Sequence, residues 1–246
     1  MHPVIAIDGP SGVGKGTVAR ALAAALGCRH VDTGAMYRAV AWRAQQLGID
    51  LDDESAVTAV AREAALEVDG SRVVIDGTDV SAAIRTPEVD RATTRVARLP
   101  RVREELVARQ RALAEQGPVV REGRDIGTVV FPGAAVKIYL DASPAERARR
   151  RAHDPAHTAA ATQDLAGIAE AMQRRDENDR TRQASPLSIA SDAAVVDTTG
   201  IPAAEVVRAV LAVVRERAGL ELGTLQAPCR INAVAPDVPG GGSPER

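Results

Sequence analysis

The chain has 246 residues, of which 45% are apolar and 26% are charged, and its formal net charge is −2. This length suits one α/β domain that carries an inserted lobe better than two independent domains. The small net charge excludes a global basic field for nucleic acid, and no apolar run reaches the ~18 to 20 residues of a membrane span, so we expect a cytoplasmic protein without nucleic-acid or membrane partners.

The N-terminal segments predict the opening of a parallel α/β fold. A short apolar run, Val4–Asp8, predicts a strand, and a glycine-rich turn separates it from a helix expected at about Lys15–Leu26. A second strand at Arg29–Asp32 leads into a helix from about Gly34 to Leu47. This order of strand, loop, helix and strand is typical of α/β proteins.

The next stretch has a different character. Residues Leu66–Val80 alternate between apolar and polar, with the turn pairs Asp69-Gly70 and Asp76-Gly77 between the apolar runs. Such turns between alternating runs predict a small antiparallel sheet. Helices are expected around it at Glu54–Ala65, Pro87–Arg98 and Val102–Glu115. We therefore interpret residues of about 35–116, here called the insertion, as a mixed α/β lobe set into the α/β core.

The α/β pattern then resumes. Strands are expected at Pro118–Arg121, Ala135–Leu140 and Ala193–Asp197, and helices at Pro144–Arg151, Asp164–Arg182 and Ala203–Ala218. The sequence thus predicts one domain over residues 1–220, with its core in 1–34, 117–151 and 183–220, helices on both faces of its parallel sheet, and a short lid at about 152–162. Residues 221–246 are rich in proline and glycine and lack periodicity, which predicts a disordered tail.

A phosphate-binding loop is predicted between the first strand and the first helix. Glycines there let backbone N–H groups turn toward phosphates, and the helix N-terminus adds unpaired donors and partial positive charge. The residues expected to bind ATP are Gly9, Pro10, Ser11, Gly12, Val13, Gly14, Lys15, Gly16 and Thr17. Gly16 replaces the hydroxyl residue that usually follows the lysine, so the residue that contacts Mg²⁺ stays open. The spacing excludes a dinucleotide-binding loop.

Lysine usage strengthens the prediction. The chain has only two lysines, Lys15 and Lys137, and all of its other residues counted as Lys or Arg are arginines. One of the two falls where a compact cation suits the β- and γ-phosphates better than a planar guanidinium does. Lys137 is expected on a strand face and receives no role. The same scarcity excludes a GTPase, which needs an Asn-Lys-x-Asp segment to read its base.

Four further segments resemble bacterial cytidylate kinases, which are nucleoside monophosphate kinases of the P-loop class. They are Asp32-Thr-Gly-Ala-Met-Tyr-Arg38, Pro100-Arg-Val-Arg103, Glu122-Gly-Arg-Asp-Ile-Gly-Thr128 and Arg175-Asp-Glu-Asn-Asp-Arg-Thr-Arg182. Together with the phosphate loop they span almost the whole chain except the tail. The resemblance implies transfer of a phosphoryl group from ATP to CMP or dCMP with Mg²⁺ as a cofactor, and it implies that Gly123 lies at the acceptor.

The resemblance also implies which residues hold the acceptor phosphate and sugar. Arg38, Arg124 and Arg182 would bind the phosphate, for which planar guanidinium groups are suited because they donate in pairs. Arg175 and Asp179 would lie near the sugar hydroxyls. Taken alone, however, the charged run from Arg174 to Arg182 would more often be a solvated helix face.

By the same resemblance, Asp125 and Arg103 read the cytosine with help from Thr94, and Thr33 and Tyr37 line the acceptor pocket. A carboxylate can accept from the cytosine amino group, whereas uracil offers a carbonyl oxygen there and would be repelled. Tyr37 taken alone would as often be a core residue.

For catalysis we expect Lys15, Arg124 and Arg150 to act on the transferring group, with Arg147 and Arg151 as further candidates near the lid. Phosphoryl transfer depends mainly on positioning and charge neutralisation. Two alternatives stay open: a P-loop kinase for another nucleotide or a small metabolite, and an ATP-dependent switch without catalysis. Nothing marks a dimer interface, so a monomer is expected. The spacing of His153 and His157 could suggest a metal site, but a solvated pair is favoured.

Overall fold

The computed structural model describes residues 2–154 and 164–218. The predicted tail and most of the predicted lid, including His157, therefore lie outside the described residues. In the described part of the chain no helix is both long and apolar enough to cross a bilayer.

Two sheets organise the described residues. Five parallel strands form the larger sheet in the order β2-β6-β1-β7-β8, and three antiparallel strands form the smaller one in the order β3-β4-β5. The strands are β1 (Val4–Asp8), β2 (Arg29–Asp32), β3 (Leu66–Asp69), β4 (Arg72–Ile75), β5 (Thr78–Asp79), β6 (Val119–Glu122), β7 (Val136–Asp141) and β8 (Ala194–Asp197).

Helices connect and cover these strands. They are α1 (Lys15–Leu26), α2 (Thr33–Gln46), α3 (Glu54–Glu63), α4 (Pro87–Val96), α5 (Pro100–Ala114), α6 (Pro144–Ala152), α7 (Leu165–Thr181) and α8 (Ala203–Ala218), with a 3₁₀ turn η1 (Ala83–Arg85) and a π-helical turn η2 (Ile126–Val130). The predicted α/β class, the parallel core and the small antiparallel insert are confirmed.

The apolar content of each strand matches its place in the large sheet. All five residues of β1 and all four of β6 are buried, as expected for inner strands of a parallel sheet that is covered on both faces. Alternate residues of the edge strand β8 are exposed. The carboxyl ends of the parallel strands consequently meet at one edge, where the phosphate loop follows β1.

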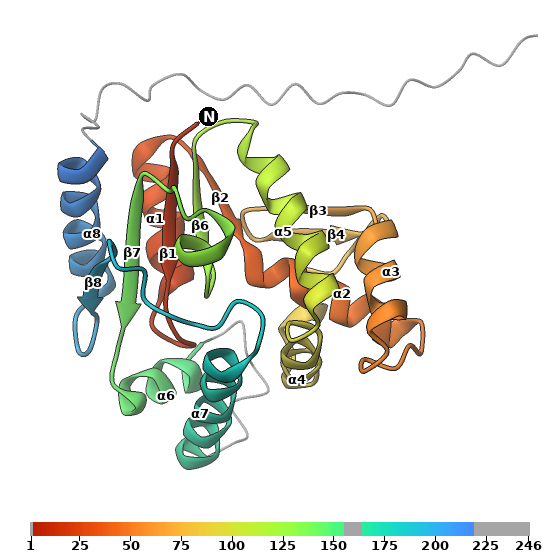
Figure 1. Cartoon of the computed structure of the whole chain (residues 1–246). Helices are drawn as coiled ribbons and strands as arrows, with labels where there is room; N and C mark the ends of the chain where they lie inside the picture. Colours follow the sequence, from red (N-terminus) through yellow and green to blue (C-terminus); the bar gives the residue numbers. More distant parts are fainter. Residues whose placement is uncertain (1, 155–163, 219–246) are drawn as a thin grey trace, which may run out of the picture.

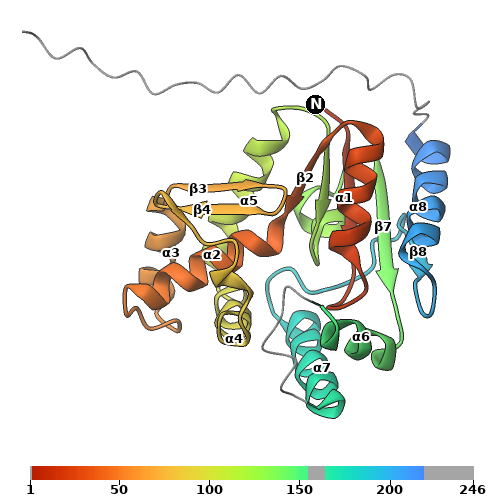
Figure 2. The same ribbon diagram turned by 180° about the vertical axis from the view of Figure 1, so that it is seen from behind.

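Helices α1 and α8 cover one face of the large sheet. Leu22 of α1 and Val210 of α8 are fully buried in one apolar cluster with Ile7 and Ile138 of the sheet. Figure 2 shows α1 in front of the strands from this side, and Figure 1 shows η2 on the opposite side. There Ile126 and Val130 of η2 pack on Ala6 of the sheet together with Val107 of α5.

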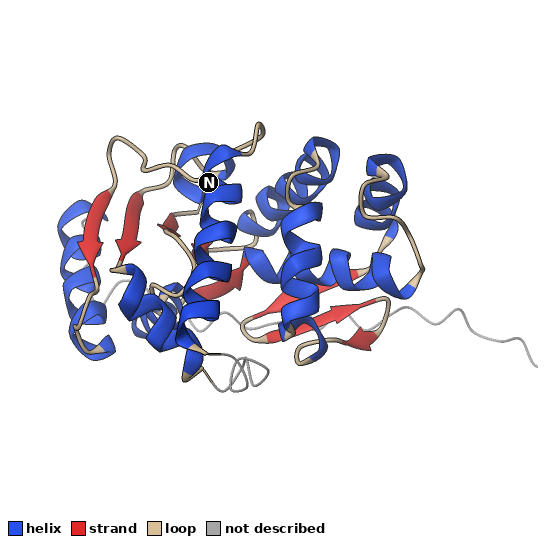
Figure 3. Ribbon diagram, turned by 90° about the horizontal axis from the view of Figure 1, so that it is seen from below, coloured by secondary structure: helices blue, strands red, loops and turns tan. Residues whose placement is uncertain are grey.

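The small sheet and α2–α5 lie beside the β2 edge of the large sheet, where Val31 of β2 forms a single β-bridge with Gly70, and Figure 3 shows this part of the molecule next to the large sheet. A buried cluster around Val40 of α2 and Leu106 of α5 forms the centre of this part of the molecule. The boundaries of the insertion as a domain, residues 35–116, stay a prediction.

Most element bounds agree with the predictions to within two residues, and the differences have local causes. Helix α2 begins at Thr33 because the Asp32 side chain caps it by accepting from the Ala35 N–H at 3.1 Å. Helix α5 begins at Pro100 because proline suits the first helical position, where no N–H is needed. The π-helical turn η2 was not predicted, since nothing in its sequence distinguishes it from a loop.

Candidate active site

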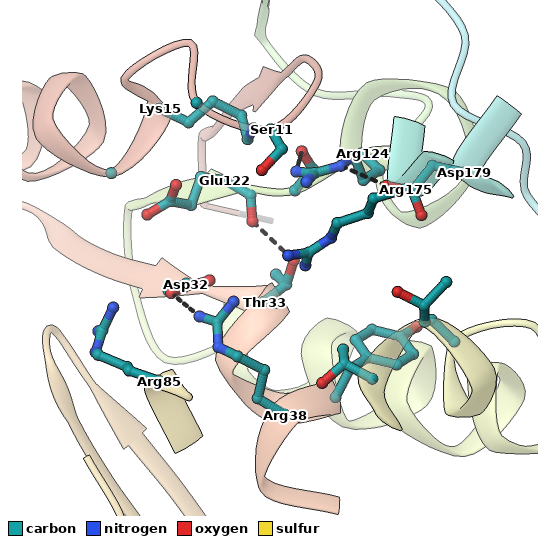
Figure 4. A pocket seen from close by; sticks show the side chains of 18 of the residues that line it. Ser11, Lys15, Asp32, Thr33, Arg38, Arg85, Glu122, Arg124, Arg175 and Asp179 are labelled. Carbon is teal, nitrogen blue, oxygen red and sulfur yellow. Dashed lines mark hydrogen bonds and ion pairs between the residues drawn. The ribbon is translucent and has the colours of Figure 1, made fainter. Parts of the chain in front are cut away.

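A cavity of about 880 Å³ opens at the carboxyl ends of the parallel strands, where ligands of open α/β sheets bind. The phosphate loop forms one end of it, and residues of the insertion form the other. All of the predicted acceptor-site residues line it: Thr33, Tyr37, Arg38, Thr94, Arg103, Gly123, Arg124, Asp125, Arg175, Asp179 and Arg182. Figure 4 shows Ser11 and Lys15 of the phosphate loop on one side of the cavity and Arg38 and Arg85 on the other.

The phosphate loop lies close against the sheet. Gly9 has a φ of +147°, and a Cβ atom built on it would lie 2.1 Å from the Leu140 carbonyl oxygen of β7. Only glycine fits there, because backbone cannot yield as a flexible side chain can. Of the predicted ATP-binding residues, Gly9, Pro10 and Val13 form the loop without lining the cavity, whereas the rest line it.

Lys15 is buried and folds back over its own loop. Its Nζ atom donates to the carbonyl oxygens of Gly9 at 2.8 Å and Pro10 at 2.6 Å. Burial, and then the nearby Arg124 cation, lower the pKa of Lys15 to about 7. The lysine is thus held at the loop by weak neutral acceptors, which a phosphate oxygen could replace.

Helices α6 and α7 brace the loop from outside. Asp176 of α7 accepts from the Ser11 backbone N–H at 3.0 Å and pairs with Arg147 of α6. The guanidinium of Arg147 also donates to the Ser11 carbonyl oxygen at 3.2 Å. Arg147 does not line the cavity, so the structure gives it a supporting place in the loop's scaffold.

Arg150 connects the same loop with the end of the sheet. It donates to the Val13 carbonyl oxygen at 3.3 Å and to the Thr198 hydroxyl at 2.8 Å, and it lines the cavity. Glu146, one helical turn earlier, accepts from its Nε atom at 2.8 Å. Arg150 therefore belongs to α6, which is fixed against the phosphate loop. In the chain it precedes the predicted lid.

Two guanidinium groups flank Asp32 in the cavity. Arg38 donates to Asp32 at 2.6 Å, and Arg85 of η1 lines the cavity nearby. Figure 4 shows Arg38 and Arg85 on either side of Asp32. Burial alone would raise the pKa of Asp32, but Arg38 and Arg85 hold it below its usual value. This end of the cavity is therefore cationic and suited to an anion.

A second charged cluster joins the predicted readers of the base. The side chain of Arg103, on α5, is 4% exposed and pairs with Asp125, and its Cζ atom lies 5.3 Å from the centre of the Tyr37 ring. Arg182 lies 3.5 Å from the other oxygen of Asp125. A carboxylate has several lone pairs, so Asp125 can keep these partners and still accept from a ligand.

Asp179 links two of the arginines in the cavity, Arg124 and Arg182. It accepts from Arg124 Nε at 2.8 Å and lies 3.6 Å from Arg182. Burial would raise the pKa of Asp179, but the cations, first Arg124 and then Arg175, lower it below its usual value. The Thr33 hydroxyl donates to the Glu122 carbonyl oxygen at 2.7 Å, which leaves its own lone pairs free to accept from a ligand.

Glycine is required again after β6. A Cβ atom on Gly123 would lie 2.8 Å from the Thr33 hydroxyl and 2.7 Å from the Ile126 side chain. Because glycine has no Cβ atom, the backbone at Gly123 can pass close to α2. This close approach brings the next two residues, Arg124 and Asp125, into the cavity.

Two carboxylates, Asp8 and Glu122, end the neighbouring strands β1 and β6 beside the phosphate loop, and they differ in what they can bind. Asp8 accepts from the Ile126 and Gly127 N–H groups at 2.9 and 2.7 Å, burial raises its pKa to about 6, and it does not line the cavity. Glu122 contacts buried His30 at 2.9 Å and lines the cavity. In the described part of the chain no group of three or more His, Cys, Asp or Glu side chains could hold a metal.

Several residues of the site were not predicted. Arg20 and Arg85 line the cavity, and Asp176 holds the loop, but each acts with partners distant in sequence. The sole signal for these residues in the sequence is that they are charged and occur in an otherwise ordinary helix or turn. Lys137 lies on a strand as expected and pairs with Asp192 at 2.9 Å, and His153 contacts the Arg149 carbonyl oxygen at 2.8 Å.

Comparisons with known proteins agree with this geometry. A sequence model described as cytidylate kinase matches residues 5–216. The cytidylate kinase of Geobacillus kaustophilus (strain HTA426) is 47% identical over 219 residues, covering 87% of this chain and 97% of the relative. That of Pelotomaculum thermopropionicum (strain DSM 13744 / JCM 10971 / SI) is 48% identical over 215 residues, covering 85% and 95%. That of Solibacter usitatus (strain Ellin6076) is 46% identical over 220 residues, covering 87% and 93%.

Proposed function

The chain belongs to the cytidylate kinase family, and we propose that it transfers the γ-phosphoryl group of ATP to CMP and dCMP, giving ADP with CDP or dCDP. The observation that carries the proposal is one continuous cavity in which a phosphate loop and a cluster of arginines and carboxylates face each other. Such a cavity suits two nucleotides that meet at their phosphates.

At the donor end, the loop from Ser11 to Thr17 would hold the ATP phosphates. Backbone N–H groups and the N-terminus of α1 supply donors and partial positive charge. Lys15 would leave the Gly9 and Pro10 carbonyl oxygens and bind phosphate oxygens, with which its ammonium group interacts more strongly. Arg150, fixed by Glu146 and Thr198, would add charge to the transferring group.

At the acceptor end, Arg38, Arg124 and Arg182 would bind the phosphate of the monophosphate. One of its oxygens attacks the γ-phosphorus of ATP, the bond from that phosphorus to the β,γ-bridging oxygen breaks, and ADP leaves with the electron pair. No general base is needed, because the attacking phosphate is already anionic. Neutralising and aligning the two phosphates is therefore the main task of the protein.

Mg²⁺ fits this arrangement as an ion bound mainly by the phosphates of the nucleotide. In such sites the ion usually takes one or two carboxylates together with substrate phosphates, so a complete protein cage is not required. Glu122 is the carboxylate that a metal could use there, because it lines the cavity close to Gly16 of the loop, whereas Asp8 does not line the cavity. The ion would neutralise charge on the phosphates.

Asp125 and Arg103 would read the cytosine, with Thr94 beside them. The proposal is supported by the close pairing of the two side chains, which fixes a carboxylate acceptor and a guanidinium donor together in a buried place. Asp179 and Arg175 would bind the sugar. Monomeric state, cytoplasmic location and the division into core, insertion and lid stay predictions from the sequence.

The test is release of ADP from ATP with CMP, dCMP, UMP, AMP, GMP and shikimate offered separately. We expect fast turnover with CMP and dCMP. Turnover with a different acceptor would leave a P-loop kinase with a misassigned pocket. Absence of turnover with every acceptor would favour a nucleotide-dependent switch.

A further inference from the structure

Asp90 lies on α4 and touches three residues that line the cavity. Its carboxylate pairs with Arg151 of α6 and accepts from Arg175 Nη1 of α7 at 3.0 Å. Its main-chain carbonyl oxygen accepts from the Thr94 hydroxyl at 3.1 Å. Thr94, Arg151 and Arg175 all line the cavity. The carboxylate of one residue in the insertion thus joins α4 to α6 and α7, and the same residue's backbone holds Thr94 one turn further along α4.

This bridge is largely shielded from solvent. The side chain of Asp90 is 12% exposed, and those of Arg151 and Arg175 are 20% and 19% exposed. Salt and water screen such a pair less than they screen an ion pair on the open surface. The carboxylate also lies in the first turn of α4, where a helix favours negative charge. The bridge is therefore a firm connection between α4 and the other two helices.

The two arginines stand next to residues that brace the phosphate loop. Arg151 follows Arg150, which donates to the Val13 carbonyl oxygen. Arg175 precedes Asp176, which accepts from the Ser11 N–H. Figure 1 shows α4 opposite α7, with α6 beside α7. The Asp90 bridge consequently joins the helices that support the donor end to the helix that carries Thr94 at the acceptor end.

We infer that Asp90 is a positioning residue that couples the two ends of the cavity, so that binding of ATP strengthens binding of CMP. A phosphate bound at the donor end restricts α6 and α7 through the phosphate loop. The bridge passes this restriction to α4, and the acceptor pocket is then already ordered when CMP arrives. The inference rests on the proposed function, because it takes ATP and CMP as the two ligands.

The experiment is the affinity for CMP, measured by calorimetry on the full chain with and without a non-hydrolysable ATP analogue. Asp90→Asn removes the charge and keeps the shape. Glu88→Gln is the matched control, because Glu88 is an exposed acid in the same first turn of α4. Asp90→Glu tests whether a carboxylate alone restores the effect.

In the unaltered protein the analogue should tighten CMP binding at least about fivefold, the lower range of coupling between sites. Asp90→Asn should reduce this ratio to near unity, Asp90→Glu should recover part of it, and Glu88→Gln should leave it unchanged. The inference is overturned if Asp90→Asn keeps the full ratio, or if the unaltered protein has no coupling. Turnover of CMP by the unaltered protein is measured alongside, since its absence would refute the proposed function instead.

Discussion

The backbone N–H of Ser11 donates to the carboxylate of Asp176 at 3.0 Å, although the two residues are 165 positions apart in the chain. Arg147 completes the contact by pairing with Asp176 and donating to the Ser11 carbonyl oxygen. Both backbone polar atoms of one phosphate-loop residue are therefore held by side chains of α6 and α7. The conformation of the loop depends on these helices as well as on its glycines.

Asp176→Asn should accordingly weaken both the fold and ATP binding. The change leaves the buried guanidinium of Arg147 without its charge partner, which costs about 3 kcal/mol or more in the free energy of unfolding. Urea denaturation and the KM for ATP measure the two effects. Glu177→Gln, an exposed neighbour on the same helix, is the control and should alter neither. Equal denaturation midpoints for the two variants would contradict the bracing of the loop.

Lys15→Met should lower kcat by roughly a hundredfold to a thousandfold, which is the loss that removal of one hydrogen-bond donor to the transition state causes in other enzymes. The affinity for CMP should change little, because Lys15 lies at the donor end of the cavity. Single-turnover kinetics and CMP titration separate the two quantities. A variant that keeps normal turnover would rule out the phosphate-loop assignment.

Binding of ATP should take up a proton at pH 8. The pKa of Lys15 in the free protein is lowered to about 7, mainly by burial and then by Arg124, so the lysine is mostly neutral at that pH. Phosphates favour the charged form and raise the pKa, so affinity falls as the pH rises above about 7. Calorimetry with an ATP analogue in two buffers of different ionisation enthalpy measures the proton. Identical heats in both buffers would disprove the uptake, and Lys15→Met should abolish it.

Asp125→Asn should reduce the preference for CMP over UMP. An amide can donate to the uracil carbonyl oxygen as well as accept, so the repulsion that excludes uracil disappears. The ratio of kcat/KM for the two substrates should fall about tenfold or more, as expected for one hydrogen bond to a charged group. Arg103 also loses its charge partner, so the ratio, and not the absolute rate, is the informative quantity. An unchanged ratio would mean that another residue reads the base.

Arg121→Met should make the protein more stable. Arg121 lies on β6 and is fully buried, and its three guanidinium nitrogens have no hydrogen-bond partner in the described part of the chain. Burial and the nearby Arg29 lower the pKa of Arg121 to about 10. Its guanidinium makes a cation–π contact with Phe131, whose ring centre lies 5.2 Å from the Arg121 Cζ atom. An apolar side chain of similar length should raise the free energy of unfolding by about 1 to 4 kcal/mol.

Urea denaturation measures this gain. The matched control is Arg29→Met on the neighbouring strand, because Arg29 donates to Gln116 and to the Leu113 carbonyl oxygen. That variant should lose stability. A lower midpoint for Arg121→Met as well would mean that Arg121 stabilises the fold.

Local sequence patterns predicted most of the fold because the signals involved are local. The apolar run of β1, the glycines of the phosphate loop and the Asp-Gly turns of the small sheet each act within a few residues. The strand order and the π-helical turn η2 could not be read in this way, since they depend on packing between distant segments.

The candidate site divides in the same manner. Residues in recognisable motifs, such as Arg124 and Asp125, were predicted and do line the cavity, whereas their roles in binding stay proposals. Arg147 was one of three arginines considered for the transferring group, and the structure places it against Ser11, outside the lining of the cavity. Asp90 and Asp176 drew no prediction, because a carboxylate on a charged helix resembles any solvated acid until its partners from other helices are known.

The contact of Thr198 with the phosphate loop sets the order in which the site can form during synthesis. Thr198 follows β8, and its hydroxyl oxygen lies 3.3 Å from the carbonyl oxygen of Val13, which is 185 residues earlier in the chain. At roughly 5 to 20 residues per second, the ribosome needs about ten seconds or more to make the intervening chain. The phosphate loop leaves the ribosome well before Thr198 does, so a nascent chain should not hold nucleotide firmly until β8 and the residues that follow it have emerged.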